Sequence, residues 1–353
     1  MTDFAQWLDR FVPHKGQAPT LIRTMVELTY GCNLRCVHCY NPTHEAKGEL
    51  STGQVFRILD QLAQQGVMWI GLTGGELLTR RDAFEIFRYA KPKGFLISLL
   101  TNATMVTSEV ADRLQEIAPY QIDVSIYGGT AATYEKVTRV PGSFSKFVGG
   151  VNLLMERGLS ILLKIVLMTL NVHELDQMRE FARSRKLPYR VSTEITPKVD
   201  GSEEPLAYRL PPEQAFEVWR QISGDKIKQN LHPDLQEEDR CGSAGKLFDC
   251  RCGKSGAAIT PYGRMNLCVS TQYPQYDLTQ GTVAEGWETL VKIVSDAKPS
   301  PEYECQECGL ARHCTRGTMD GWLEQGTFDG PCIPHFREIA QKKSTFLGES
   351  FTV

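Results

Sequence analysis

Three cysteines stand close together near the N-terminal end of the chain, with the spacing C-x3-C-x2-C. They are Cys32, Cys36 and Cys39, in the stretch "TYGCNLRCVHCYNP". Three thiolates on one loop can hold three irons of a [4Fe–4S] cube and leave the fourth iron open to an outside ligand. A closed electron-transfer cluster takes four cysteines, and a structural zinc site also takes four ligands. His38 is the residue that would complete a zinc site, although its strand-like surroundings favour another direction for its ring.

The remaining eight of the eleven cysteines all lie between residues 241 and 332. The N-terminus lacks the basic and apolar segments of a signal peptide, so we expect a cytoplasmic protein whose thiols stay reduced. Clustered thiols in such a chain indicate metal or iron–sulfur ligation rather than disulfides. A zinc ribbon is the alternative that the C-x2-C pairs leave open. The eight are Cys241, Cys250, Cys252, Cys268, Cys305, Cys308, Cys314 and Cys332.

Composition and charge exclude several classes of partner. The chain has 353 residues, of which 41% are hydrophobic and 23% charged, and its formal net charge is −3. This charge gives no electrostatic reason to bind nucleic acid or an anionic membrane surface. No apolar run approaches the roughly 20 residues that a membrane-spanning helix needs. We therefore expect a globular protein with no nucleic-acid or membrane partner.

Short β-rich runs alternate with helical patterns from about residue 21 to 225, giving roughly six βα units. Such alternation predicts a parallel sheet covered by helices, either open or closed into a full or partial barrel. Strands are expected at 21–30, 67–73, 95–101, 120–127, 160–170 and 189–196. Helices are expected at 51–66, 82–90, 107–117, 173–185 and 212–223, with further helical stretches between 128 and 157.

Chemistry in a parallel α/β fold gathers at the carboxyl ends of the strands. The cysteine triplet follows the first expected strand directly, and "TGGE" (73–76) follows the second. Both segments should therefore lie on one rim of the sheet.

Five regions are predicted along the chain. An N-terminal amphipathic segment (1–20) precedes the βα series (21–225). A polar linker (226–240) leads to a cysteine-rich unit (241–340), and the tail (341–353) is either loose or a docking strand.

The segment "CNLRCVHCY" resembles the C-x3-C-x-Φ-C signature of radical S-adenosylmethionine (radical SAM) enzymes, with His38 at the ring position Φ. In that family the amino and carboxylate groups of S-adenosylmethionine (SAM) chelate the open iron. One electron then cleaves SAM to methionine and a 5′-deoxyadenosyl radical. The resemblance implies an α/β fold, a partial (β/α)6 TIM-like barrel followed by a small cysteine-rich iron–sulfur domain.

The stretch "LTGGELL" resembles the GGE motif of the same family. Gly74, Gly75 and Glu76 match the motif, which receives the methionine amino group, and Leu77 replaces the usual proline. Glycines let backbone carbonyls approach a cation, and a carboxylate accepts hydrogen bonds from an ammonium group.

Two further strand ends resemble cofactor-binding segments of the family. "LLTNATMV" is similar to the TNG-type segment, with Asn102 retained and Ala103 in place of glycine. "VSIYGG" is similar to the S-x-D-G segment, with Ser125 retained and Tyr127 in place of aspartate. The resemblance implies that Ser125 donates a hydrogen bond to the ribose or carboxylate of SAM.

Three charged residues of the βα series have two interpretations each. Lys164 lies in an apolar strand, where it either extends to the strand end or pairs with the SAM carboxylate. Arg139 is open to the same two interpretations, and Glu194 faces either the barrel or the surface. The sequence identifies no catalytic acid or base.

Residues 252–332 resemble the SPASM extension of radical SAM enzymes, a pattern of cysteines that binds auxiliary clusters. Thr318 occupies one position where that pattern has cysteine. The resemblance implies one cluster on Cys305, Cys308, Cys314 and Cys332. It implies a second on Cys252 and Cys268 with Cys250 and Cys241, which keeps an open iron if Cys241 is not a ligand. Together with the triplet, this makes three [4Fe–4S] clusters.

The resemblance implies an enzyme that abstracts hydrogen from a ribosomally made precursor peptide and so modifies it after translation. A separate leader-peptide-binding protein is then expected as a partner, with a flavodoxin or ferredoxin as reductant. One alternative is a radical SAM enzyme acting on a small molecule or porphyrin, as in haem-type decarboxylation. The alternative from another class is an iron–sulfur electron carrier or scaffold.

Overall fold

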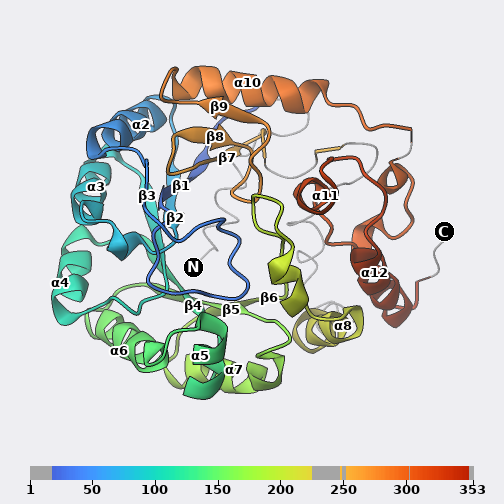
Figure 1. The fold of residues 1–353 in the computed structure, drawn as a ribbon, viewed down its shortest axis with the longest axis horizontal. Helices are drawn as coiled ribbons and strands as arrows, with labels where there is room; N and C mark the ends of the chain where they lie inside the picture. Colours follow the sequence, from blue (N-terminus) through green and yellow to red (C-terminus); the bar gives the residue numbers. More distant parts are fainter. Residues whose placement is uncertain (1–17, 225–246, 249–251, 302, 350–353) are drawn as a thin grey trace.

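A single sheet organises the part of the chain that the structure describes, which is residues 18–224, 247–248, 252–301 and 303–349 of a computed structural model. The sheet has nine strands in the order β6-β5-β4-β3-β2-β1-β7-β8-β9 (Figure 1). Their bounds are β1 Arg23–Thr29, β2 Trp69–Gly74, β3 Leu96–Thr101, β4 Gln121–Ile126, β5 Ile161–Val166, β6 Tyr189–Ser192, β7 Gly256–Ile259, β8 Arg264–Asn266 and β9 Gln275–Asp277.

All neighbouring pairs from β1 to β6 are parallel, as is the pair of β1 with β7. Strands β7, β8 and β9 follow one another in antiparallel pairs. Parallel neighbours place their carboxyl ends on one rim. The fold is therefore the partial TIM-like barrel that the family resemblance implied, one of the arrangements that the βα alternation had left open.

Helices cover the outer face of this sheet (Figure 1). In the βα series they are α2 Thr52–Gln64, α3 Ala83–Ala90, α4 Ser108–Ile117, α5 Ala131–Thr138, α6 Ser143–Glu156, α7 Leu175–Ser184 and α8 Pro212–Trp219. Helix α2 begins at the predicted place because Ser51 and Gln54 form a reciprocal capping box at its N-terminus. The later helices are α10 Val283–Asp296, α11 Thr318–Gln325 and α12 Pro334–Phe346.

Strand residues alternate between the helix layer and the barrel interior. In β4, Ile122, Val124 and Ile126 are fully buried in the hydrophobic core. Successive side chains of a strand point to opposite faces, so Asp123 and Ser125 lie on the interior face. The interior of the barrel therefore carries polar groups while the outer face supplies the core.

The sheet continues past the expected end of the βα series. Arg23 to Val26 of β1 pair with Gly256 to Ile259 of β7. Arg57 of α2 also donates from Nη2 to the Leu278 carbonyl at 2.8 Å. The five predicted regions stay predictions, and the expected linker at 226–240 lies outside the described residues.

Helix α12 packs beside α8 (Figure 1). Helix α12 extends to Phe346, whose ring meets Trp219 edge-on at 6.0 Å between centroids. The expectation of a loose tail or docking strand from residue 341 is therefore wrong for 341–346. The amphipathic pattern of the helix extends into that stretch and buries Lys343 and Ser344. In the described residues, no helix is long and apolar enough to cross a membrane.

Candidate functional site

The cysteine triplet lies on an irregular loop that begins where β1 ends. Two backbone hydrogen bonds fasten this loop to the last turn of α5, from Arg35 N to Thr138 O and from Val37 N to Val137 O, both at 3.0 Å. Within the loop, Cys39 N donates to Cys36 O at 3.2 Å. The loop is thus held at the carboxyl rim by contacts from outside its own strand.

The three cysteines of the triplet are partly buried, and their thiols interact electrostatically. Burial raises the pKa of Cys32 to about 11, and it raises those of Cys36 and Cys39. The negative charges of Cys39 and Cys32 raise the pKa of Cys36 further, which places all three within electrostatic reach. Ligation to iron requires deprotonated thiols, so the donor set fits a cluster that stabilises the thiolates. The structure describes no fourth cysteine on this loop.

His38 and Tyr127 close one side of the triplet. Their rings meet edge-on with 4.8 Å between centroids. Burial lowers the pKa of His38 to about 4, and its Nδ1 has no hydrogen-bond partner. The Tyr127 hydroxyl interacts with the Cys36 thiol and the Ser125 hydroxyl. Tyr127, which stands where the family has aspartate, therefore packs against the cysteine loop.

Glu76 of the GGE segment points into the protein. Its side chain is fully buried and accepts from the Thr101 hydroxyl at 2.8 and 2.9 Å. Asn102 N donates to it at 2.7 Å and Leu78 N at 3.2 Å. Burial raises the pKa of Glu76, while these donors act against that rise. The carboxylate therefore joins the ends of β2 and β3.

The two glycines of the GGE segment allow it to touch the cysteine loop. Gly75 N donates to Thr29 O at 2.7 Å, and Glu76 N to Gly31 O at 2.9 Å. A Cβ at Gly74, where φ is +138°, would lie 2.1 Å from Thr29 O. A Cβ at Gly75 would lie 2.4 Å from Gly31 O. Any side chain there would separate the two loops.

Asn102 links the third strand end to the cysteine loop. Its Nδ2 donates to Asn33 Oδ1 at 3.0 Å, and its Oδ1 accepts from Thr104 N at 2.9 Å. Ala103 has φ of +58°, a left-handed conformation that explains why glycine is common at this position in the family. The structure thus brings together Asn102, Glu76 and the triplet.

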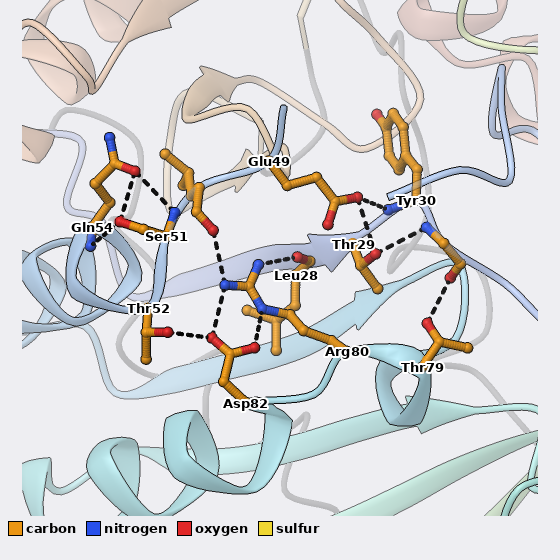
Figure 2. Close-up of polar contacts among 12 residues, drawn as sticks. Leu28, Thr29, Tyr30, Glu49, Ser51, Thr52, Gln54, Thr79, Arg80 and Asp82 are labelled. Atoms are coloured by element: carbon orange, nitrogen blue, oxygen red, sulfur yellow. Dashed lines mark hydrogen bonds and ion pairs between the residues drawn. The ribbon is translucent and has the colours of Figure 1, made fainter. Parts of the chain in front are cut away.

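A second layer of polar contacts, which the sequence did not reveal, supports the start of the cysteine loop (Figure 2). Glu49 accepts from Tyr30 N at 2.7 Å and from the Thr29 hydroxyl at 3.0 Å. Arg80 donates to Leu28 O at 2.7 Å and pairs with Asp82 at 2.8 Å. The guanidinium therefore fixes the end of β1 to the segment that follows the GGE residues.

Lys164 has a partner inside the barrel. Its Nζ lies 2.9 Å from Oδ2 of Asp123, and its side chain is 39% exposed. Ser125 and Lys164 are paired across β4 and β5, which places both on the interior face. Arg139 lies at the exposed end of α5, and its Nη2 is 3.3 Å from the Tyr208 hydroxyl. Asp123 is a site candidate that sequence reasoning missed, because only the strand register reveals its pairing.

Four of the later cysteines line one cavity in the C-terminal region. They are Cys305, Cys308, Cys314 and Cys332, and the cavity encloses about 440 Å³, part of it open to solvent. Burial raises the pKa of Cys314 to about 11, and the other three thiols raise it further. Four thiols around one cavity are the donor set of a closed iron–sulfur cluster.

The other later cysteines are only partly described. Cys252 and Cys268 lie partly buried against the core, whereas Cys241 and Cys250 lie outside the described residues. Thr318 begins α11 with its hydroxyl bonded to the Leu247 carbonyl. Among the residues the structure describes, no three or more His, Cys, Asp or Glu side chains are arranged to hold a single metal ion.

Comparison with known proteins identifies the domain that carries the triplet. Residues 26–182 match the model of the radical SAM superfamily. This region is a radical SAM domain. Such a domain implies a [4Fe–4S] cluster and SAM as cofactors. The matched region runs from β1 to α7 and includes both the triplet and the GGE segment.

Two curated relatives cover this radical SAM chain to different extents. Mycofactocin maturase MftC of Mycobacterium tuberculosis (strain CDC 1551 / Oshkosh) is 27% identical over 339 residues, covering 91% of this chain and 85% of the relative. AdoMet-dependent heme synthase of Methanosarcina barkeri is 34% identical over 168 residues. That second match spans 47% of this chain and 48% of the relative.

A solved structure shares the fold. Streptococcus suis SuiB bound to precursor peptide SuiA matches with a TM-score of 0.70, 12% identity, and coverage of 94% of this chain and 78% of that one. The agreement extends over the barrel and the region that follows it.

Proposed function

We propose that this radical SAM enzyme modifies a ribosomally made precursor peptide. The observation that carries the proposal is the hydrogen-bonded contact between the cysteine loop and the GGE segment at one rim of the barrel. The match to a mycofactocin maturase along 85% of that relative supports a peptide substrate. A peptide-bound structural neighbour of the same fold also supports it.

Cys32, Cys36 and Cys39 would hold the cluster and leave one iron open to SAM. When bound, these cofactors supply one-electron cleavage of SAM to methionine and a 5′-deoxyadenosyl radical, which takes hydrogen from the substrate. The packed rings of Tyr127 and His38 would limit the access of water to the triplet. The backbone hydrogen bonds that join the cysteine loop to α5 and to the GGE segment support these roles.

The remaining site residues would either bind SAM or position the segments that do. The backbone of Gly74 and Gly75 offers carbonyls to an ammonium group, while Glu76 accepts from three protein donors and positions β3. Asn102, next to both, fixes the cysteine loop. Ser125 and Lys164 present a hydroxyl and an ammonium toward the barrel interior, where the carboxylate and ribose of SAM need donors.

Two auxiliary clusters complete the proposal. One would be held in the cavity lined by Cys305, Cys308, Cys314 and Cys332. The other would use Cys252 and Cys268 together with Cys241 and Cys250. A leader-peptide-binding protein and a flavodoxin or ferredoxin are the proposed protein partners.

In the decisive experiment, the enzyme is reconstituted and reduced without oxygen and is then given SAM together with a candidate precursor peptide, chosen from any short reading frames near its gene. We expect release of 5′-deoxyadenosine and a mass change in the peptide, read by chromatography and mass spectrometry. A second assay, run in parallel, replaces the peptide with iron coproporphyrin. Loss of carboxyl groups from that porphyrin, with the peptide unchanged, would replace the proposal by haem-type decarboxylation.

The remaining alternative, an iron–sulfur electron carrier without radical chemistry, predicts a different result in the same assay. Enzyme with its full iron that neither binds nor cleaves SAM, with or without peptide, would be an electron carrier or scaffold.

A further inference from the structure

A buried arginine faces the four-cysteine cavity of the C-terminal region. Arg316 is 4% exposed, and its Nη1 lies 3.3 Å from Sγ of Cys305. Its backbone N–H donates to Sγ of Cys314 at 3.4 Å. One residue therefore donates to two of the four thiols.

The other contacts of Arg316 provide no counter-charge. Its Nη2 lies 3.4 Å from both Gln325 Oε1 and Gly330 O, and its Nε has no hydrogen-bond partner. In the described part of the chain, Arg316 contacts no carboxylate. A buried cation without an anion costs several kcal/mol. The sulfur atoms are the groups that could supply the missing negative charge.

The fold reserves space for this guanidinium. A Cβ built on Gly321 of α11 would lie 2.6 Å from Arg316 Nη2 and 2.9 Å from Thr327 O. A larger residue at Gly321 would displace the guanidinium from its present position.

Further cations surround the same cavity. Lys343 of α12 is 6% exposed, and the negative charge of Cys314 favours its protonated form against burial. Burial raises the pKa of Cys332, and the positive charge of Arg337, which also lines the cavity, acts against that rise. Glu304 lies 3.6 Å from Arg337. Among the described cations around the cavity, Arg316 is the one that combines deep burial with a direct contact to a cysteine sulfur.

We propose that Arg316 is a positioning residue whose charge and hydrogen bonds stabilise the reduced form of an auxiliary iron–sulfur cluster held by Cys305, Cys308, Cys314 and Cys332. The inference rests on the proposed auxiliary cluster. Hydrogen bonds to cysteine sulfurs and net local charge set the potential of such clusters. Reduction adds one negative charge, which a buried cation favours.

The test measures the midpoint potential of this cluster by redox titration followed with electron paramagnetic resonance. The full chain carries Cys32→Ala, Cys36→Ala and Cys39→Ala, so that the triplet contributes no signal. The cluster signal is assigned by its loss in Cys305→Ala/Cys308→Ala. Arg316→Gln and Arg316→Lys are compared with Arg312→Gln, which removes an exposed arginine from the neighbouring turn.

We expect Arg316→Gln to lower the equilibrium constant for reduction at least tenfold, which is about 59 mV for one electron. Arg316→Lys should shift it less, and Arg312→Gln should leave it near the parent value. Equal shifts in Arg316→Gln and Arg312→Gln would overturn the proposal.

Iron content covers the case in which a variant assembles poorly. Loss of iron in Arg316→Gln with retention in Arg316→Lys supports the need for positive charge. Loss of iron in both Arg316 variants, with iron retained in Arg312→Gln, overturns the proposal and indicates that Arg316 has a packing role. If the parent and Cys305→Ala/Cys308→Ala held equal iron, these cysteines would bind no auxiliary cluster, and the proposed function would fail at that point instead.

Discussion

Cys36 lies at the centre of the triplet, between two other thiols and the Tyr127 hydroxyl. Cys36→Ala removes one of three ligands, so we expect SAM cleavage to be abolished. The auxiliary irons should remain, because their proposed ligands lie more than 200 residues further along the chain. The measurement is 5′-deoxyadenosine and iron per chain after anaerobic reconstitution. Cleavage at the wild-type rate would exclude the triplet from the site.

Asp320 near the start of α11 gives a pH-dependent prediction. Burial, with the nearby charge of Glu194, raises its pKa to about 7 from 3.8, although Gly317 N donates to it. A carboxyl group whose pKa is raised by folding contributes its full stability when the pH lies below its pKa in the unfolded state. That contribution is lost as the pH rises through 7. The free energy of unfolding should therefore fall by about 1.4 kcal/mol per pH unit between these values.

Asp320→Asn should remove this pH dependence, since an amide does not titrate. Thermal unfolding midpoints between pH 5 and 7.5 provide the comparison. Asp296→Asn, an exposed substitution at the end of α10, should keep the wild-type slope. Identical slopes in all three proteins would contradict the assignment to Asp320.

The functional positions near the rim could be predicted where they belong to a local sequence motif, as Gly75 and Ala103 do. Contacts between distant segments were not predictable. The pair of Lys164 with Asp123 depends on strand register, and the contact of Arg316 with Cys305 depends on a turn of irregular backbone. Neither arginine nor aspartate stands out in the sequence, because each is common on protein surfaces.

The loops after β1 and β2 behave as one element, since backbone hydrogen bonds join them at 2.7 and 2.9 Å. Gly75→Ala would place a Cβ 2.4 Å from Gly31 O, so we expect a loss of about 1–3 kcal/mol in stability. SAM cleavage should fall with it. Unfolding midpoints and 5′-deoxyadenosine release measure the two effects.

The matched control is Gly53→Ala in α2, where nothing lies within 4 Å of the added Cβ. Helix propensity makes that change neutral or stabilising by about 1 kcal/mol at most. If both variants retained full stability and cleavage, the two loops would not need their close contact.

The strands and helices of the βα series were predictable to within a few residues because hydrophobic periodicity there agrees with capping and turn signals. The strands β7, β8 and β9 were not predicted. They have three or four residues each, too few for a periodic pattern. Strand β7 forms on the free edge of β1, and β8 and β9 then add to β7 in turn.

At the scale of the whole molecule, the cysteines predict the iron content. Three cubes would give about twelve irons per chain after anaerobic reconstitution. Cys305→Ala/Cys308→Ala should reduce this to about eight while the triplet remains loaded. A wild-type value near four would mean that the C-terminal thiols serve another purpose.

The pairing of β1 with β7 has a consequence for recombining this chain with its relatives. In a chimera joined between residues 226 and 240, β7 would come from the relative and would have to pair with the β1 of this chain, which carries the cysteine loop. A fragment ending at 225 would leave Arg23 to Val26 as an open edge that favours aggregation. A junction placed after Asp277 keeps strand and partner from one parent, and is the crossover we would choose.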